Sequence, residues 1–128
     1  FGYMLYVTSN PAYDQYVLLM VDFMANLSEA LEFYDHLETS PPYSLLQELD
    51  NRAIPKFEEN LTIIEATNQI AHLPAELIQR NELLNEYCNL RIETFELFRK
   101  AIKENSDDYT EELVRLNQKI EKALIKLQ

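Results

Sequence analysis

Residues 10–37 read NPAYDQYVLLMVDFMANLSEALEFYDHL, and this stretch decides the fold. Asn10 can accept a hydrogen bond at a helix N-cap, and Pro11 suits the first helical position because no N–H partner is needed there. Apolar residues then return in alternating steps of three and four, which places them on one face of an α-helix. That face consists of Tyr16, Met20, Phe23, Leu27, Ala30, Tyr34 and Leu37. The stretch therefore predicts a long amphipathic helix.

The first half of this helix is also apolar outside that face. The additional residues include Val17, Leu18, Val21 and Met24. A helix that is apolar nearly all round has to bury more than one side. Apolar surface that the domain itself does not cover usually meets another chain or a bilayer. We therefore predict that these four residues form an interaction surface.

The second helix is predicted to contain a proline. The Pro-Pro pair at 41–42 ends the first helix, since consecutive prolines cannot continue it. An apolar stripe resumes at Leu46 and runs to Ala71. Pro55 lies inside this stripe and cannot donate a backbone hydrogen bond. We therefore expect a kink or a break near Ile54.

Two further helices complete the pattern. The third follows Pro74 and runs to about Glu104. The fourth begins at residues 106–108, and the spacing of Asp108 to Glu111 fits a capping box. Long helices joined by short connections favour antiparallel neighbours. The sequence thus predicts an all-α fold, an antiparallel up-down-up-down four-helix bundle, as a single domain over residues 9–128.

Residues 1–8 precede this domain as an apolar arm without charges. The chain starts with Phe1 rather than methionine, which indicates a piece excised or processed from a longer protein. The arm is too short to span a bilayer, which takes about 20 apolar residues, and it lacks the basic start of a signal peptide. Two interpretations stay open: an ordered arm packed on the core, and the end of a transmembrane helix.

The composition excludes several classes of function. The 128 residues contain 11 Lys+Arg and 22 Asp+Glu, so the formal net charge is −11. Such a chain repels phosphate backbones, and we expect no nucleic-acid partner. The single glycine, Gly2, excludes the glycine-rich loops of nucleotide-binding motifs and the nucleophile elbow.

No catalytic or metal-binding pattern is present in the sequence. His36 and His72 are the only imidazoles and lack the spacing of metal ligands. Cys88 allows no internal disulfide, and its place in an apolar stripe is typical of a small core residue. We therefore predict no catalytic residue, no metal and no cofactor, and we expect that this segment is not an enzyme.

Arg91 points close to the apolar stripe of the third helix, near Cys88 and Phe95. A guanidinium keeps its charge, so a buried one has to be matched by a carboxylate or by several carbonyl oxygens. Two interpretations of Arg91 are open. It forms a salt bridge at the edge of the core that fixes helix register, or it lies at the floor of a pocket for an anionic ligand.

Charge is distributed unevenly along the chain. Residues 1–51 contain eight acids and no Lys or Arg. The simplest interpretation is an acidic, solvated face. If residues 1–7 end a membrane span, a flank without Lys or Arg favours the non-cytoplasmic side, because cytoplasmic flanks are enriched in these residues.

Several stretches of the second half carry a family resemblance. They are IPKFEENL at 54–61, RNELL at 80–84, EYCNLRIE at 86–93 and KAIKEN at 100–105. They resemble the soluble helical extension after the membrane core of some bacterial rhomboid-family intramembrane serine proteases. The resemblance implies a tether to the bacterial cell membrane through residues before Phe1. It carries no catalytic residue onto this chain, since no serine here is flanked by glycine.

The expected function follows from the lack of catalytic residues and from this resemblance. We expect a non-catalytic accessory or interaction domain of a rhomboid-like membrane protease. Its role would be substrate recruitment, regulation or self-association, with another protein or a second copy as partner. The alternative from another class is a small-molecule sensor or binding bundle, with a pocket lined by tyrosines and Arg91.

Overall fold

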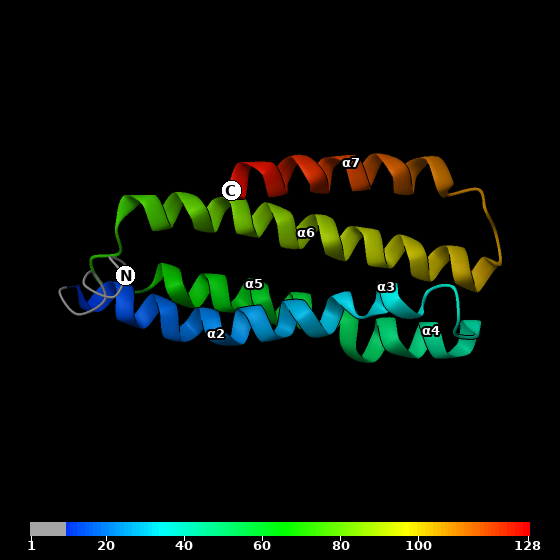
Figure 1. Ribbon diagram of the computed structural model, residues 1–128, viewed down its shortest axis with the longest axis horizontal. Coiled ribbons are helices and arrows are strands. Elements are labelled where there is room, and N and C mark those ends of the chain that lie inside the picture. Colours follow the sequence, from blue (N-terminus) through cyan, green and yellow to red (C-terminus); the bar gives the residue numbers. More distant parts are fainter. Residues whose placement is uncertain (1–9) are drawn as a thin grey trace.

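The computed structural model describes residues 10–128, and every regular element in this part of the chain is a helix. The elements in chain order are α2 (Pro11–Leu31), α3 (Phe33–His36), α4 (Pro42–Glu48), the π-helical η1 (Leu49–Ala53), α5 (Ile54–Asn68), α6 (Ala75–Glu104) and α7 (Thr110–Leu127). These elements form four long segments, α2–α3, α4–η1–α5, α6 and α7, and successive segments run in opposite directions (Figure 1). The predicted all-α, four-helix architecture is confirmed. The predicted arm at 1–8 lies outside the described residues.

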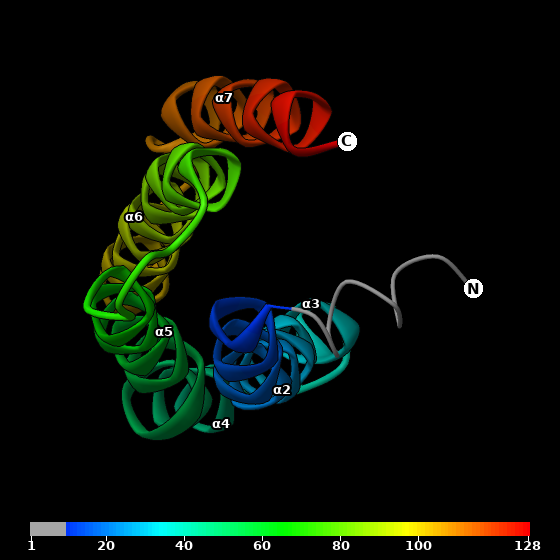
Figure 2. The same ribbon diagram turned by 90° about the vertical axis from the view of Figure 1, so that its left-hand side faces the viewer.

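The four long helical segments pack in an open arc. α5 lies between α2 and α6, and α7 packs on the other side of α6. Viewed along the long axis, α2, α5, α6 and α7 follow a curve, and α7 does not lie beside α2 (Figure 2). The inner side of this curve is called the concave face below. The helices of residues 10–128 therefore leave one face of the bundle without a helix packed on it.

The second helical segment runs from α4 through η1 into α5 without a loop. The backbone N–H of Ile54 donates to the carbonyl of Leu49, five residues back, which is the spacing of a π turn. Pro55 has no N–H to donate to the carbonyl of Asn51, so the helix widens at this place. The irregularity predicted near Ile54 is thus a single π turn.

Helix ends follow the sequence signals in part. Asn10 Oδ1 accepts from the backbone N–H of Ala12 at 3.0 Å, which confirms the predicted N-cap of the first helix. α6 ends at Glu104, as predicted, and Asn105 follows in the left-handed conformation with φ 49°. The predicted capping box of the last helix is not formed, because α7 begins at Thr110 without a side-chain cap.

An aromatic cluster joins α3, α5 and α6. Phe33, Phe57 and Phe95 are fully buried, and the ring centroid of Phe95 lies 5.6 Å from that of Phe33 and 5.7 Å from that of Phe57. These separations are those of favourable tilted and edge-on pairs. Because α5 separates α2 from α6 along the arc, the contact between α3 and α6 is made across the concave face. The contact of Phe33 with Phe95 therefore links α3 to α6 at one end of the arc.

Buried amides hold the helices in register. Asn26 of α2 donates through Nδ2 to Asn60 Oδ1 of α5 at 3.1 Å, and Asn60 Nδ2 donates to the carbonyl of Phe23 at 3.1 Å. Asn60 is fully buried. A buried amide costs free energy unless it is hydrogen-bonded, so a shift of α2 along α5 would break these bonds at a cost.

Candidate functional site

Arg91 lies between the side chains of Tyr34 and Tyr87. Its Nε donates to the Tyr87 hydroxyl and its Nη1 to the Tyr34 hydroxyl, both at 3.1 Å. Its Cζ lies 5.4 Å from each ring centroid, which is within cation–π range. Tyr34 belongs to α3 and Arg91 to α6, so this contact also crosses the concave face. Two aromatic side chains thus hold the guanidinium in place.

No carboxylate of this chain pairs with Arg91. Within residues 10–128 none of the ion pairs includes it, and residues 1–9 contain no Asp or Glu. By contrast, Arg52 pairs with Glu32 at 2.8 Å, and Arg99 Nε lies 2.7 Å from Asp50 Oδ1. The salt bridge expected at Arg91 is therefore not formed, and tyrosyl oxygens stand in its place.

Tyr34 accepts from Arg91 as a neutral hydroxyl. Burial raises the pKa of Tyr34, and the positive charge of Arg91 offsets only part of that rise. Tyr87 is buried as well. The tyrosyl oxygens are used as acceptors, while each O–H remains able to donate.

The predicted interaction surface on α2 is largely exposed. Leu18, Val21 and Met24 have exposed fractions of 72%, 59% and 57%, and Val17 is half-buried. Val17, Val21 and Met24 line one shallow apolar depression, together with Tyr16 and Met20. Leu18 lies outside this depression. The structure thus brings three of the four predicted residues together.

This depression on α2 opens toward the concave face. Tyr13 lies one turn before Val17 and three turns before Met24, so the three side chains leave α2 in similar directions. The Tyr13 hydroxyl donates to Glu76 at the start of α6. Since α6 is the next helix beyond α5, the side of α2 that carries Tyr13 is the side turned to the inside of the arc.

A second depression lies between α6 and α7, with a volume of about 470 Å³. Thr94 and Phe98 of α6 and Val114 of α7 are among its lining residues. Phe98 lies two turns after Arg91 on the same face of α6, so this depression adjoins the arginine. Val114 is 52% exposed and lines this depression, whereas Ile125, three turns later, is 67% exposed and lies outside it. We call α2 and α7 the two limbs of the arc. The concave face therefore carries apolar side chains on both limbs, and Arg91 lies on α6 between them.

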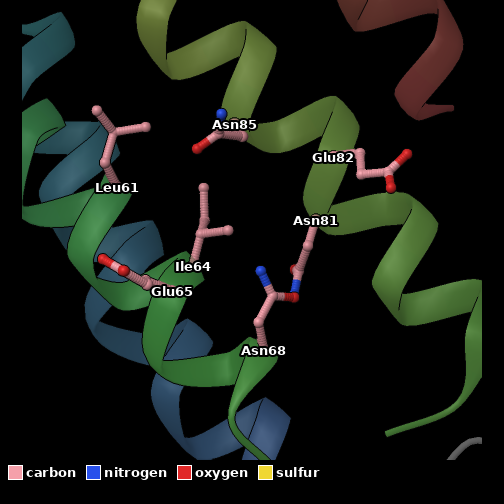
Figure 3. Close-up of a pocket in the computed structure, with 7 residues that line it drawn as sticks. All are labelled: Leu61, Ile64, Glu65, Asn68, Asn81, Glu82 and Asn85. Carbon is pink, nitrogen blue, oxygen red and sulfur yellow. The ribbon is translucent and has the colours of Figure 1, made fainter.

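A third hollow lies away from Arg91, and Figure 3 shows the residues that line it. It is a groove between α5 and α6 lined by Leu61, Ile64, Glu65, Asn68, Asn81, Glu82 and Asn85. Glu82 stands nine positions before Arg91, which is half a turn away around the helix. The groove and Arg91 therefore belong to different faces of the molecule.

The side-chain amides of Asn81 and Asn68 in this groove make hydrogen bonds within the chain. Asn81 Nδ2 donates to Thr67 Oγ1 and to Asn68 Oδ1, both at 2.8 Å, and Asn81 Oδ1 accepts from the Tyr16 hydroxyl at 3.2 Å. Asn81 and Asn68 point toward one another in Figure 3. Both amide hydrogens of Asn81 are therefore used. This network joins α2, α5 and α6 rather than offering donors to a ligand.

The histidines and the cysteine are not brought together. His36 Nδ1 lies 3.0 Å from Glu48 Oε2, and His72 is exposed in a turn with φ 61°. Cys88 is fully buried, and burial raises the pKa of its thiol to about 12. Within residues 10–128, no three side chains of the metal-ligating types cluster closely enough to hold an ion. Across the same range, no helix combines the length and apolarity needed to cross a bilayer.

Comparison with known proteins finds no relative of this chain. No family model, no curated protein and no solved structure matches this chain. The resemblance to rhomboid extensions stays a prediction. The concave face, which carries apolar side chains and the guanidinium of Arg91, is the candidate functional site of this chain.

Proposed function

We propose that this chain is a non-catalytic interaction domain that binds a protein partner on its concave face. The observation that supports this most is the pair of apolar surfaces on the two limbs of the arc. Val21 and Met24 on α2, and Val114 on α7, are each more than half exposed, and each lines an apolar depression. Apolar side chains gathered on one face of a protein mark docking sites.

The rhomboid resemblance supplies a setting for this proposal. In that setting the domain follows the membrane core of a bacterial protease and is tethered through residues before Phe1, on the non-cytoplasmic side. There it would recruit substrates, regulate the protease or bind a second copy of itself. The sequence stretches between residues 54 and 105 support this part, and the acidic composition argues against a nucleic-acid partner.

Site-specific photo-crosslinking in the cells that make the protein tests the binding face. A photoreactive amino acid is placed at Met24 or at Val114 on the concave face, or at Leu18, which is 72% exposed on the same helix but outside the depression. We expect adducts of one defined mass from Met24 and Val114 and not from Leu18. An adduct with the mass of two chains identifies self-association. Absence of adducts at both concave positions, or equal adducts at all three, contradicts the proposal.

The alternative of a small-molecule binding domain has one observation in its favour, at a place other than the pocket of tyrosines and Arg91 that the sequence suggested. The groove between α5 and α6 has a volume of about 480 Å³, which is within the range of small-ligand pockets. Glu65 and Glu82 line it, so a ligand would be a small cation such as an amine. A thermal-shift screen of small amines would raise the Tm of the wild type and leave Glu82→Gln unchanged. A screen without shifts contradicts this alternative.

A further inference from the structure

We infer that Arg91, Tyr34 and Tyr87 form a carboxylate-binding site, and that the carboxylate belongs to a polypeptide bound on the concave face. The carboxylate would be that of an acidic side chain or of the C-terminus of the bound polypeptide. The assignment of a polypeptide source rests on the proposed function. The carboxylate chemistry stands on the geometry of the three side chains alone.

The three side chains present hydrogen-bond donors without acceptors. Tyr34 and Tyr87 accept from Nη1 and Nε through their oxygens, so each keeps a hydroxyl hydrogen to donate. Arg91 Nη2 adds two more N–H groups. In the described part of the chain, neither hydroxyl hydrogen nor Nη2 donates a hydrogen bond. A cluster that contains only donors matches an oxyanion.

The charge of Arg91 points to the same ligand. A half-buried guanidinium loses part of its hydration, and neutral tyrosines replace that loss only in part. The chain contains 22 acids, and none of them is placed against Arg91. The planar guanidinium can receive a carboxylate through two parallel hydrogen bonds. An external carboxylate would therefore complete the arrangement.

The surroundings of Arg91 favour a polypeptide over a free ion. The depression with Phe98 and Val114 starts at Thr94, one turn after the arginine, and the depression with Val21 and Met24 lies on the side of α2 that is turned to the inside of the arc. A bare carboxylate leaves both surfaces empty. A residue whose carboxylate binds Arg91 can place its own or a neighbouring apolar side chain against them, which adds binding free energy.

NMR on the full chain tests this assignment through the Nε–H signal of Arg91. The probes are sodium acetate, sodium chloride at equal ionic strength, N-acetyl-leucine and N-acetyl-leucinamide. We expect acetate to shift the signal with saturation and chloride not to do so. We expect N-acetyl-leucine to bind about tenfold more tightly than acetate, because its side chain is partly buried, and the amide not to bind.

Variants separate the site from general effects of charge. Tyr34→Phe keeps the ring and removes one donor to the anion, so N-acetyl-leucine should bind about tenfold more weakly. Arg91→Lys keeps the charge but loses the planar fork, and we expect a loss of tenfold or more. Tyr43→Phe removes an exposed hydroxyl on α4 and should leave binding unchanged. Equal affinity of Tyr34→Phe and wild type, or equal shifts with chloride and acetate, overturns the site.

Three outcomes separate the carboxylate chemistry, the polypeptide source and the proposed function. If acetate and N-acetyl-leucine bind equally well, the polypeptide source is overturned, and the site is one for small free carboxylates. If neither binds while crosslinks at Met24 persist, the carboxylate site is overturned and the interaction function stands. If acetate binds saturably but no crosslinks form, the carboxylate chemistry is supported and the interaction function fails.

Discussion

Asn81→Ala tests whether the buried amide network holds the arc together. Asn81 is 1% exposed and makes three hydrogen bonds, to Tyr16 of α2, to Thr67 of α5 and to Asn68 of α5. Each buried hydrogen bond contributes about 1 kcal/mol net, so the variant should lose about 3 kcal/mol of unfolding free energy. For a chain of this length that corresponds to a fall in Tm of roughly 10 °C.

The measurement is urea unfolding followed by helical circular dichroism, with Asn89→Ala as the matched control. Asn89 lies on the same helix but is exposed, and its Nδ2 donates only to the carbonyl of Asn85 at 3.0 Å. The control should change the unfolding free energy by less than about 0.5 kcal/mol. If the two variants lose the same free energy, the network does not stabilise the packing of α2, α5 and α6, and the reasoning is wrong.

Three further predictions concern the core, the thiol and the tyrosines. Phe95→Ala should lose about 3–5 kcal/mol in the same assay, because the fully buried ring packs on Phe33 and Phe57 and leaves a cavity. Cys88 should not react with a thiol reagent at pH 8 in the folded protein and should react after unfolding, since burial raises its pKa to about 12. Burial raises the pKa of Tyr34, and a hydrogen bond to Glu104 raises that of Tyr109 to about 12. The folded protein therefore retains protons that the unfolded chain releases above about pH 10, and urea titrations should show an unfolding free energy that falls as pH rises above that value.

The helices could be predicted from sequence because their signals are local. Alternating steps of three and four define a buried face, and Asn10 and Pro55 act on the backbone within one turn. The predicted single helix over 10–37 is divided into α2 and α3 at Glu32. No proline or glycine marks that division, so nothing in the local sequence signals it.

The arc and the partners of Arg91 could not be predicted in the same way. Periodicity shows that each helix buries a face, but it does not show whether the last helix returns to the first. Tyr87 lies four positions before Arg91, a spacing that places both on one helix face and could have been noticed. Tyr34 is 57 residues away from Arg91 and belongs to another helix. That pairing arises only when α3 packs across the inside of the arc.

The position of α7 at the end of the arc gives it a separate route of opening. Its buried stripe of Leu116, Ile120 and Ala123 packs mainly on α6. Detaching α7 breaks one interface and leaves the amide networks among α2, α5 and α6 intact. The backbone amides of α7 should therefore exchange with solvent deuterium through a partial opening, before the rest of the protein unfolds. A partner that spans both limbs would suppress this exchange, so deuterium uptake in α7 would report binding at a distance from α2.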